Sequence, residues 1–279
     1  MINLENSKYL LFNGNCLDIL KEVDTASIDL VMTSPPYADA RKDTYGGPKP
    51  DEYVNWFLPI SEQIFRILKP SGTFILNIKE KIVNKERHTY VLELILALKK
   101  QGWLWTEEWI WHKRNSFPGK WPNRFRDAWE RCLQFNVNSS FKMNQDSVMI
   151  PIGDWADTRL KKLCENDNDR SDSITGSSFG RKMSNWVGKE MVYPTNVLYF
   201  PTECSNKNHP AAYPKSIPEF FIKLFTDIND IVLDPFQGSG TTGVSGLEQD
   251  RRYIGIDLNK EYIDMTDMEL RRFNMDLFQ

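Results

Sequence analysis

Two short stretches of the chain combine groups that could take part in one reaction. The first, Thr33-Ser34-Pro35-Pro36-Tyr37, follows an apolar run at residues 28–32. The two prolines can continue neither a helix nor a sheet ladder, so a strand must stop there. Beyond the stop lie a hydroxyl (Ser34), a backbone carbonyl (Pro35) and a flat ring (Tyr37). These groups suit a planar ring that carries an amino group, although a Pro-Pro pair alone is more typical of a plain strand exit.

The second stretch, Asp234-Pro235-Phe236-Gln237-Gly238-Ser239-Gly240-Thr241-Thr242, has the pattern of a cofactor site. It lies between a predicted strand at 231–234 and a predicted helix, where backbone N–H groups face a ligand and glycines allow close approach. Asp257 ends the next predicted strand, at a spacing that suits hydrogen bonds from a ribose diol. We therefore expect a nucleoside-containing cofactor here. The bulk of Pro235-Phe236 departs from the dinucleotide fingerprint, which argues against a nucleotide-binding oxidoreductase.

Several side chains of the second stretch could contact the cofactor, and some of them could instead be structural. The ammonium and carboxylate of a methionyl group could bind to Asp234, Thr241 and Thr242. Phe236 could flank an adenine or pack in the core, and Asp257 could bind ribose or begin a helix. The expected cofactor-binding residues are Asp234, Phe236, Gly238, Ser239, Gly240, Thr241, Thr242 and Asp257.

Residues 112–135 combine positive charge with aromatic rings, a pattern that suits phosphates and unstacked bases. An aromatic packing face with solvated charges is the competing reading. Arg41, just after the first stretch, could also meet phosphate. The candidate nucleic-acid-binding residues are Arg41, Lys113, Arg114, Lys120, Arg124 and Arg126.

Predicted strands and helices alternate along most of the chain. Apolar runs predict strands, and apolar residues at helical spacing predict helices. Strand–helix alternation of this kind is typical of βαβ units and a mostly parallel sheet. The predicted strands are 8–16, 27–33, 73–78, 102–111, 231–234 and 253–257, with regularity returning at 196–200. The predicted helices are 17–23, 51–68, 88–100, 217–228, one from 244, and 259–273.

Composition excludes several classes of protein. The 279 residues carry a net charge of −3, so any nucleic-acid surface must be local. No apolar run is long enough for a membrane span, and the N-terminus lacks a signal-peptide pattern, which favours a cytoplasmic protein. Four scattered cysteines, without a Cys-x-x-Cys pair, argue against a zinc site and for reduced thiols, and no metal is expected.

Together the two stretches resemble the β class of amino-methylating DNA methyltransferases. In that family a Ser/Asp-Pro-Pro-Tyr motif comes early, a target-recognition segment is central and the cofactor motif comes late. His209-Pro210-Ala211-Ala212-Tyr213-Pro214 and Trp111-His112-Lys113-Arg114-Asn115 resemble two further family segments. The resemblance covers most of the chain except residues 138–195, which are rich in Ser, Asn, Asp and Gly.

The resemblance implies a fold and a division of the chain. We expect a doubly wound α/β fold with a mostly parallel, seven-stranded sheet of the S-adenosylmethionine-dependent type. The order would be circularly permuted, with the catalytic half first. Residues 1–137 and 196–279 would form the catalytic domain, and 138–195 an inserted target-recognition segment.

The resemblance also implies an activity. A monomer or homodimer would flip a base out of double-stranded DNA and transfer a methyl group from S-adenosyl-L-methionine to its exocyclic amino group. Ser34, Pro35, Pro36 and Tyr37 would be catalytic, and Ser34 favours N4 of cytosine over N6 of adenine. A cognate restriction endonuclease would be the functional partner. RNA or protein amide methylation, and a catalytically inactive DNA-binding module, are the alternatives.

Overall fold

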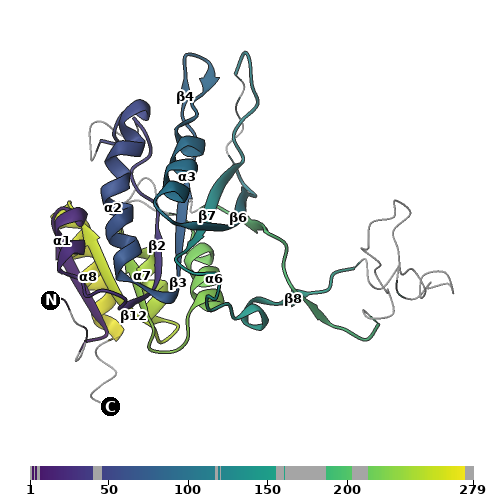
Figure 1. The fold of residues 1–279 in the computed structure, drawn as a ribbon. Helices are drawn as coiled ribbons and strands as arrows, with labels where there is room; N and C mark the ends of the chain where they lie inside the picture. Colours follow the sequence, from purple (N-terminus) through teal and green to yellow (C-terminus); the bar gives the residue numbers. More distant parts are fainter. Residues whose placement is uncertain are drawn as a thin grey trace. The chain divides into compact units, whose positions relative to one another are not determined.

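The computed structural model (Figure 1) describes residues 2, 4, 7–39, 46–116, 119, 121–154, 160, 187–202 and 213–273. Candidate residues Arg41 and Lys120, and the segment 209–212, lie outside the described residues. The chain divides into two compact units. The first comprises Met1–Asn144 and Asn196–Gln279, and the second comprises Gln145–Thr195.

A sheet of eight strands forms the centre of the first unit, in the order β1-β12-β11-β2-β3-β7-β6-β10. All neighbours pair in parallel except β7, which is antiparallel to both β3 and β6. A mostly parallel sheet was expected, and eight described strands replace the expected seven. The bounds are β1 (Tyr9–Asn13), β2 (Ile28–Thr33), β3 (Leu68–Ile78), β6 (Leu104–Lys113), β7 (Trp129–Asn136), β10 (Val197–Phe200), β11 (Ile231–Asp234) and β12 (Arg252–Asp257).

Two groups of helices cover the sheet, as Figure 1 shows. In one group α2 contacts both α1 and α3, and in the other α7 contacts both α6 and α8. Buried side chains of α1, α2 and α3 form one continuous core with β2 and β3. The bounds are α1 (Cys16–Glu22), α2 (Tyr53–Ile67), preceded by a 3₁₀ turn at Pro50–Glu52, α3 (Tyr90–Lys100), α6 (Ser216–Phe225), α7 (Thr241–Leu247) and α8 (Lys260–Leu270), followed by a 3₁₀ turn at Arg271–Phe273.

Buried strands have the apolar composition that a parallel sheet covered on both faces requires. Every residue of β2 is buried. Its one charged member, Asp29, forms an ion pair with Lys69 at 2.8 Å and accepts a hydrogen bond from the Ile231 N–H at 3.0 Å. These partners explain how a carboxylate is tolerated in a strand core.

Three local predictions differ from the structure. The strand predicted at 73–78 begins earlier, at Leu68, because residues 69–72 form a bulge: Ile28 pairs with Leu68, whereas Leu30 pairs with Thr73. Helix α7 begins at Thr241, where the sequence placed its start at Val244. No strand was predicted at β7, because several of its buried side chains are polar and interrupt the run of apolar residues that predicts a buried strand.

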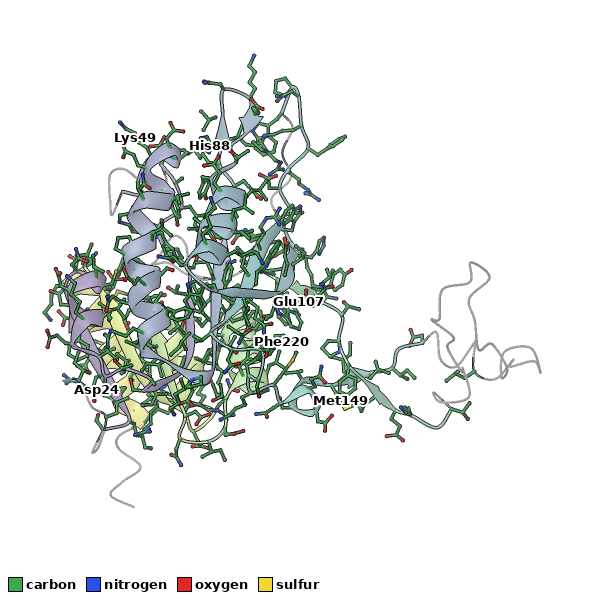
Figure 2. The ribbon with its side chains drawn as sticks, viewed as in Figure 1. Asp24, Lys49, His88, Glu107, Met149 and Phe220 are labelled. Atoms are coloured by element: carbon green, nitrogen blue, oxygen red, sulfur yellow. The ribbon has the colours of Figure 1, made fainter. Side chains whose placement is uncertain are left out.

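The smaller elements are two hairpins and one turn. In the first unit β4 (Ile82–Val83) pairs with β5 (Glu86–Arg87). In the second unit β8 (Ile150–Pro151) pairs with β9 (Met191–Val192), after a 3₁₀ turn at Gln145–Val148. Figure 2 labels Met149, which immediately precedes β8. No helix in the described part of the chain is both long and apolar enough to cross a membrane.

Candidate active site

The two motifs meet at the carboxyl ends of neighbouring strands. Thr33-Ser34-Pro35-Pro36-Tyr37 follows β2, and the glycine-containing stretch follows β11, which pairs in parallel with β2 through Val232↔Leu30 and Leu233↔Val31. Ligands of open α/β sheets bind at this edge. A side-chain hydrogen bond joins the two motifs directly, because the Thr33 Oγ1 hydroxyl donates to Asp234 Oδ1 at 2.6 Å.

Asp234 is a buried acceptor for four donors. Its Oδ1 accepts from the Thr33 hydroxyl and from the Phe236 N–H at 3.1 Å. Its Oδ2 accepts from the Thr242 hydroxyl at 2.7 Å and from the Tyr213 hydroxyl at 3.2 Å. Burial raises the pKa of Asp234 to about 6, against the opposing effect of these hydrogen bonds. The carboxylate therefore fastens the two motifs to each other, a role that the sequence did not reveal.

Asp257 lies at the end of β12, beside the cofactor motif. One carboxylate oxygen accepts from the Gly238 N–H at 2.9 Å, and the other accepts from the Asn259 N–H at 2.8 Å. The N-cap of α8 is Asn259, whose side chain accepts from the Glu261 N–H. Each carboxylate oxygen of Asp257 retains a second lone-pair direction, so the group can still accept hydrogen bonds from a ligand. Burial raises the pKa of Asp257.

The loop after β11 and the strand beside it require glycine at two positions. Gly240 has φ +77°, and a Cβ atom there would lie 2.4 Å from Thr266 Cγ2. Gly255 faces the Gln237 side chain so closely that an added Cβ would lie 1.8 Å from Gln237 Oε1. Gln237 Nε2 is buried and has no hydrogen-bond partner among the described residues. An unpaired buried amide beside an acidic acceptor matches a ligand that offers both acceptors and donors.

An aromatic pair flanks the same loop. The Phe236 ring, partly buried, lies 5.7 Å from the Trp56 ring of α2, measured between centroids. An aromatic face beside a diol acceptor suits an adenine nucleoside. The set of Phe236, Asp257 and the Gly238–Thr241 loop therefore fits the adenosyl part of S-adenosylmethionine. Trp56 was not among the expected site residues, because nothing in the helical pattern of 51–68 distinguished it.

A network of hydrogen bonds holds the expected catalytic motif at Ser34 and Tyr37. The Ser34 hydroxyl donates to the Tyr37 oxygen at 3.2 Å, and the Tyr37 hydroxyl lies 2.7 Å from Glu130 Oε2 and 3.1 Å from Asn77 Oδ1. Burial, together with the Glu130 carboxylate, holds the pKa of Tyr37 well above its usual range. The Tyr37 ring is thus fixed in place by its hydroxyl. Sequence reasoning missed Glu130, whose only signal is an acidic residue within a basic stretch.

The candidate DNA-binding residues are placed differently from one another. Lys113 is mostly buried, and its ammonium lies 2.5 Å from Glu130 Oε1, so it points into the protein. Arg114 and Arg126 are exposed. Arg124 stacks over the Trp121 ring at 4.7 Å, and Phe125 next to it is 93% exposed. The loop between β6 and β7 therefore presents cations and rings at the edge of the sheet that carries both motifs.

Comparison with known proteins assigns the chain to a family. A family model described as DNA methylase, for N6 and N4 methyltransferases, matches residues 28–268. The chain belongs to this N6/N4 DNA methylase family. The type II methyltransferase M.PvuII of Proteus hauseri is 31% identical, over 91% of this chain and 81% of that protein. The type II methyltransferase M.BglII of Bacillus subtilis is 27% identical, over 92% of this chain and 67% of that protein.

Solved structures of similar fold agree with this assignment. The cytosine-N4-specific PvuII DNA methyltransferase aligns with a TM-score of 0.71 and 24% identity, over 96% of this chain and 91% of that one. A DNA modification methylase of Thermus thermophilus, in complex with S-adenosyl-L-methionine, aligns with a TM-score of 0.62 and 20% identity, over 95% and 94% of the two chains. The expected α/β methyltransferase fold is thereby confirmed for this family member.

Proposed function

We propose that the chain transfers a methyl group from S-adenosyl-L-methionine to the exocyclic N4 amino group of cytosine in double-stranded DNA, within a restriction–modification system. The observation that carries the proposal is the hydrogen bond between the two motifs, which the Thr33 hydroxyl donates to Asp234 Oδ1 at 2.6 Å. It fixes the Ser34 hydroxyl beside the loop that fits the cofactor. The likeness to M.PvuII and to the cytosine-N4-specific structure supports cytosine.

The chain's own groups account for the difficult part of this reaction. An exocyclic amino nitrogen is a poor nucleophile, since its lone pair is conjugated into the ring. Hydrogen bonds from the amino group to Ser34 Oγ and to the Pro35 carbonyl favour a pyramidal nitrogen with an available lone pair. S-adenosylmethionine, when bound, supplies an electrophilic methyl group on a sulfonium. Placement and electrostatics provide most of the acceleration, and no covalent enzyme intermediate is needed.

Tyr37 would hold the base once it has left the duplex. A base must be flipped out of the duplex to reach a site at the edge of the sheet. Stacking on an aromatic ring contributes about 1–3 kcal/mol per base. The ring of Tyr37 suits this role because its hydroxyl is anchored on Glu130. In this proposal Asp257 binds the ribose diol and Phe236 the adenine.

The test is the identity of the methylated base. Purified protein incubated with S-adenosylmethionine and unmethylated DNA should yield N4-methylcytosine, measured by mass spectrometry of the digested nucleosides. N6-methyladenine alone would establish the adenine alternative, which other members of the family make possible. Absence of both, with methylated RNA or a protein amide instead, would refute DNA as the substrate.

The loop between β6 and β7 is proposed to contact DNA phosphates. Replacing Arg124 and Arg126 together by glutamine should weaken binding to every DNA sequence and lower the slope of log Kd against log salt by about two. Titration of labelled DNA at several salt concentrations measures the slope. Lys99→Gln is the matched control, because this exposed cation lies at the C-terminal end of α3, at the opposite edge of the sheet. An unchanged slope in the double variant would contradict the assignment.

The unit formed by Gln145–Thr195 is proposed as the target-recognition segment, within the expected insert 138–195. Proteins read DNA sequence through contacts to base edges in the grooves. A separate unit can provide these contacts independently of the catalytic sheet. A cognate endonuclease as functional partner belongs to the same proposal.

A further inference from the structure

A buried ion pair lies behind the catalytic motif and is connected to it by hydroxyl groups. Glu130 is 6% exposed and pairs with Lys113, Oε1 to Nζ, at 2.5 Å. Its second oxygen, Oε2, lies 2.7 Å from the Tyr37 hydroxyl. That hydroxyl in turn lies 3.2 Å from Ser34 Oγ. A continuous path of hydrogen bonds thus runs from a charged pair to the hydroxyl proposed to touch the base.

The topology of the sheet brings these groups together. Lys113 ends β6, Tyr37 follows β2, and Glu130 stands at the start of β7. Because β7 is antiparallel to its neighbours, its first residues lie at the edge where the parallel strands end. A parallel strand in the same place would put Glu130 at the far edge. The antiparallel strand therefore delivers a carboxylate to the catalytic side.

The path has a fixed direction. A carboxylate only accepts hydrogen bonds, an ammonium only donates them, and a tyrosine hydroxyl has one proton to give. The Tyr37 proton is therefore directed to Glu130, the nearer of its two acceptors. The second neighbour, Asn77 Oδ1, is also an acceptor, because the Asn77 amide nitrogen donates to the Arg131 carbonyl at 3.1 Å. The Tyr37 oxygen can then only accept, so the Ser34 proton points toward Tyr37.

This direction determines what Ser34 offers to a substrate. With its proton bonded to Tyr37, the Ser34 oxygen presents lone pairs only. A target amino group must donate its N–H, so an acceptor is what the reaction needs. A hydroxyl turned the other way would aim its own proton at the amino nitrogen and would engage the lone pair that has to attack the methyl group. The raised pKa of Tyr37 keeps its proton available for donation.

Lys113 holds the Glu130 carboxylate, which sets the direction of the hydrogen bonds from Ser34 through Tyr37. Its ammonium lies 4.7 Å from the Trp111 ring centroid as well as against Glu130. Removing one partner of a buried ion pair leaves an uncompensated charge, which is strongly destabilising. The pair therefore gives each of the two mostly buried charges its counterpart.

We propose that Glu130, held by Lys113, is a positioning residue for methyl transfer, which orients the Ser34–Tyr37 hydroxyl pair so that Ser34 accepts a hydrogen bond from the target amino group. The inference rests on the proposed amino-methyltransferase function and applies equally to cytosine and adenine. Glu130 acts through Tyr37 and does not touch the base.

Glu130→Gln tests the direction without changing the shape. The glutamine amide can donate to the Tyr37 oxygen, where it competes with the Ser34 hydroxyl for the lone pairs of that oxygen. The tyrosine proton is then left with Asn77 Oδ1 or Ser34 as its acceptor. We expect the single-turnover rate with saturating DNA and S-adenosylmethionine to fall about 10- to 100-fold. This is less than the cost of removing a group that itself touches the reacting centre, because Glu130 acts through Tyr37. Dissociation constants for DNA and for the cofactor should remain within about twofold, because a positioning residue acts on the transfer step.

A double-variant cycle separates positioning from general destabilisation. Tyr37→Phe keeps the ring and removes the hydroxyl, so Glu130→Gln should have no further effect on the rate in that background. Glu80→Gln is the matched control. Its carboxylate is also mostly buried at this side of the sheet, bonded to Arg131 at 2.7 Å, and makes no hydrogen bond to Tyr37. It should keep the wild-type rate.

Each outcome of the cycle decides the inference. A wild-type rate for Glu130→Gln, equal losses for Glu130→Gln and Glu80→Gln, or rate losses that multiply in the double variant would overturn it. If Glu130→Gln does not fold, a wild-type rate for Tyr37→Phe overturns the inference and a slowed rate with unchanged cofactor binding supports it. An inactive wild-type protein would instead refute the proposed function, so the two failures are distinguishable.

Discussion

Ser34→Ala is expected to lower kcat by about 100- to 1,000-fold, which is the usual cost of removing one preorganised hydrogen-bonding group at a reacting centre. The hydroxyl lies at the carboxyl end of β2, where it bonds to Tyr37 and is half-buried. Its loss leaves the target amino group with the Pro35 carbonyl as its remaining acceptor. Since the methyl group of alanine occupies less space, neither the strand nor the loop needs to move. Single-turnover methylation of DNA, with cofactor affinity measured in parallel, checks the result.

The control is a second serine beside the same strand. Ser27 directly precedes β2 at its other end, and its hydroxyl donates to the Asp24 carbonyl at 2.7 Å. Ser27→Ala removes a hydroxyl of equal size far from the motif and should leave kcat unchanged. If Ser34→Ala kept wild-type kcat, the hydroxyl would have no part in transfer. If it lost cofactor affinity in the same proportion as activity, its role would be structural.

Among the variants considered, Gly240→Ala should cause the largest loss of cofactor affinity. The backbone at Gly240 has φ +77°, a conformation that costs an L-residue about 1–2 kcal/mol. The added Cβ would also lie 2.4 Å from Thr266 Cγ2 and 2.5 Å from its Oγ1. Forcing extra atoms into packed structure costs a further 1–3 kcal/mol or so. We expect the free energy of unfolding to fall by about 2–5 kcal/mol and cofactor affinity to fall at least about tenfold.

Two further variants separate the backbone from the contact. Gly188 has φ +78° and nothing within 4 Å of an added Cβ, so Gly188→Ala bears only the conformational cost. Thr266→Ala removes the two nearest atoms and leaves Thr266 Cβ, 3.0 Å from the new Cβ. Thr266 Oγ1 has no hydrogen-bond partner among the described residues. The Gly240→Ala/Thr266→Ala protein should therefore recover part of the cofactor affinity. No recovery would mean that the backbone conformation, and not the contact with Thr266, sets the loss. Denaturant unfolding and calorimetric titration measure both quantities.

Most elements of the fold could be predicted because their signals are local. The apolar run that forms β2 and the helical spacing that forms α2 can both be read within a short window. The bulge at 69–72 could not be predicted, because Pro70 and Gly72 are ordinary turn residues and only pairing with β2 keeps them within a strand. Strand β7 also escaped prediction. Its inward residues Gln134 and Asn136 are polar, and they are buried because they bond to neighbouring strands.

The chemistry of the site divides in the same way. The sequence by itself determined which groups stand at the ends of β2 and β11, because a proline pair and a glycine turn mark those ends locally. It also indicated the family, which the comparisons confirm. The roles of Asp234 and Glu130 depend on partners that are distant along the chain. Thr33 lies 201 residues from the carboxylate to which it donates, and Tyr37 lies 93 residues from Glu130.

Only the tertiary structure decided which carboxylates are taken up by protein donors and which keep lone pairs for a ligand. Asp234, expected to bind the cofactor, has both oxygens occupied by protein donors, whereas Asp257 keeps lone pairs available. Lys113, expected to meet DNA, is turned inward by Glu130. The physical reason is that a buried charge must find its counterpart wherever the sheet brings one, and sheet order and strand direction are not written in any short stretch of residues.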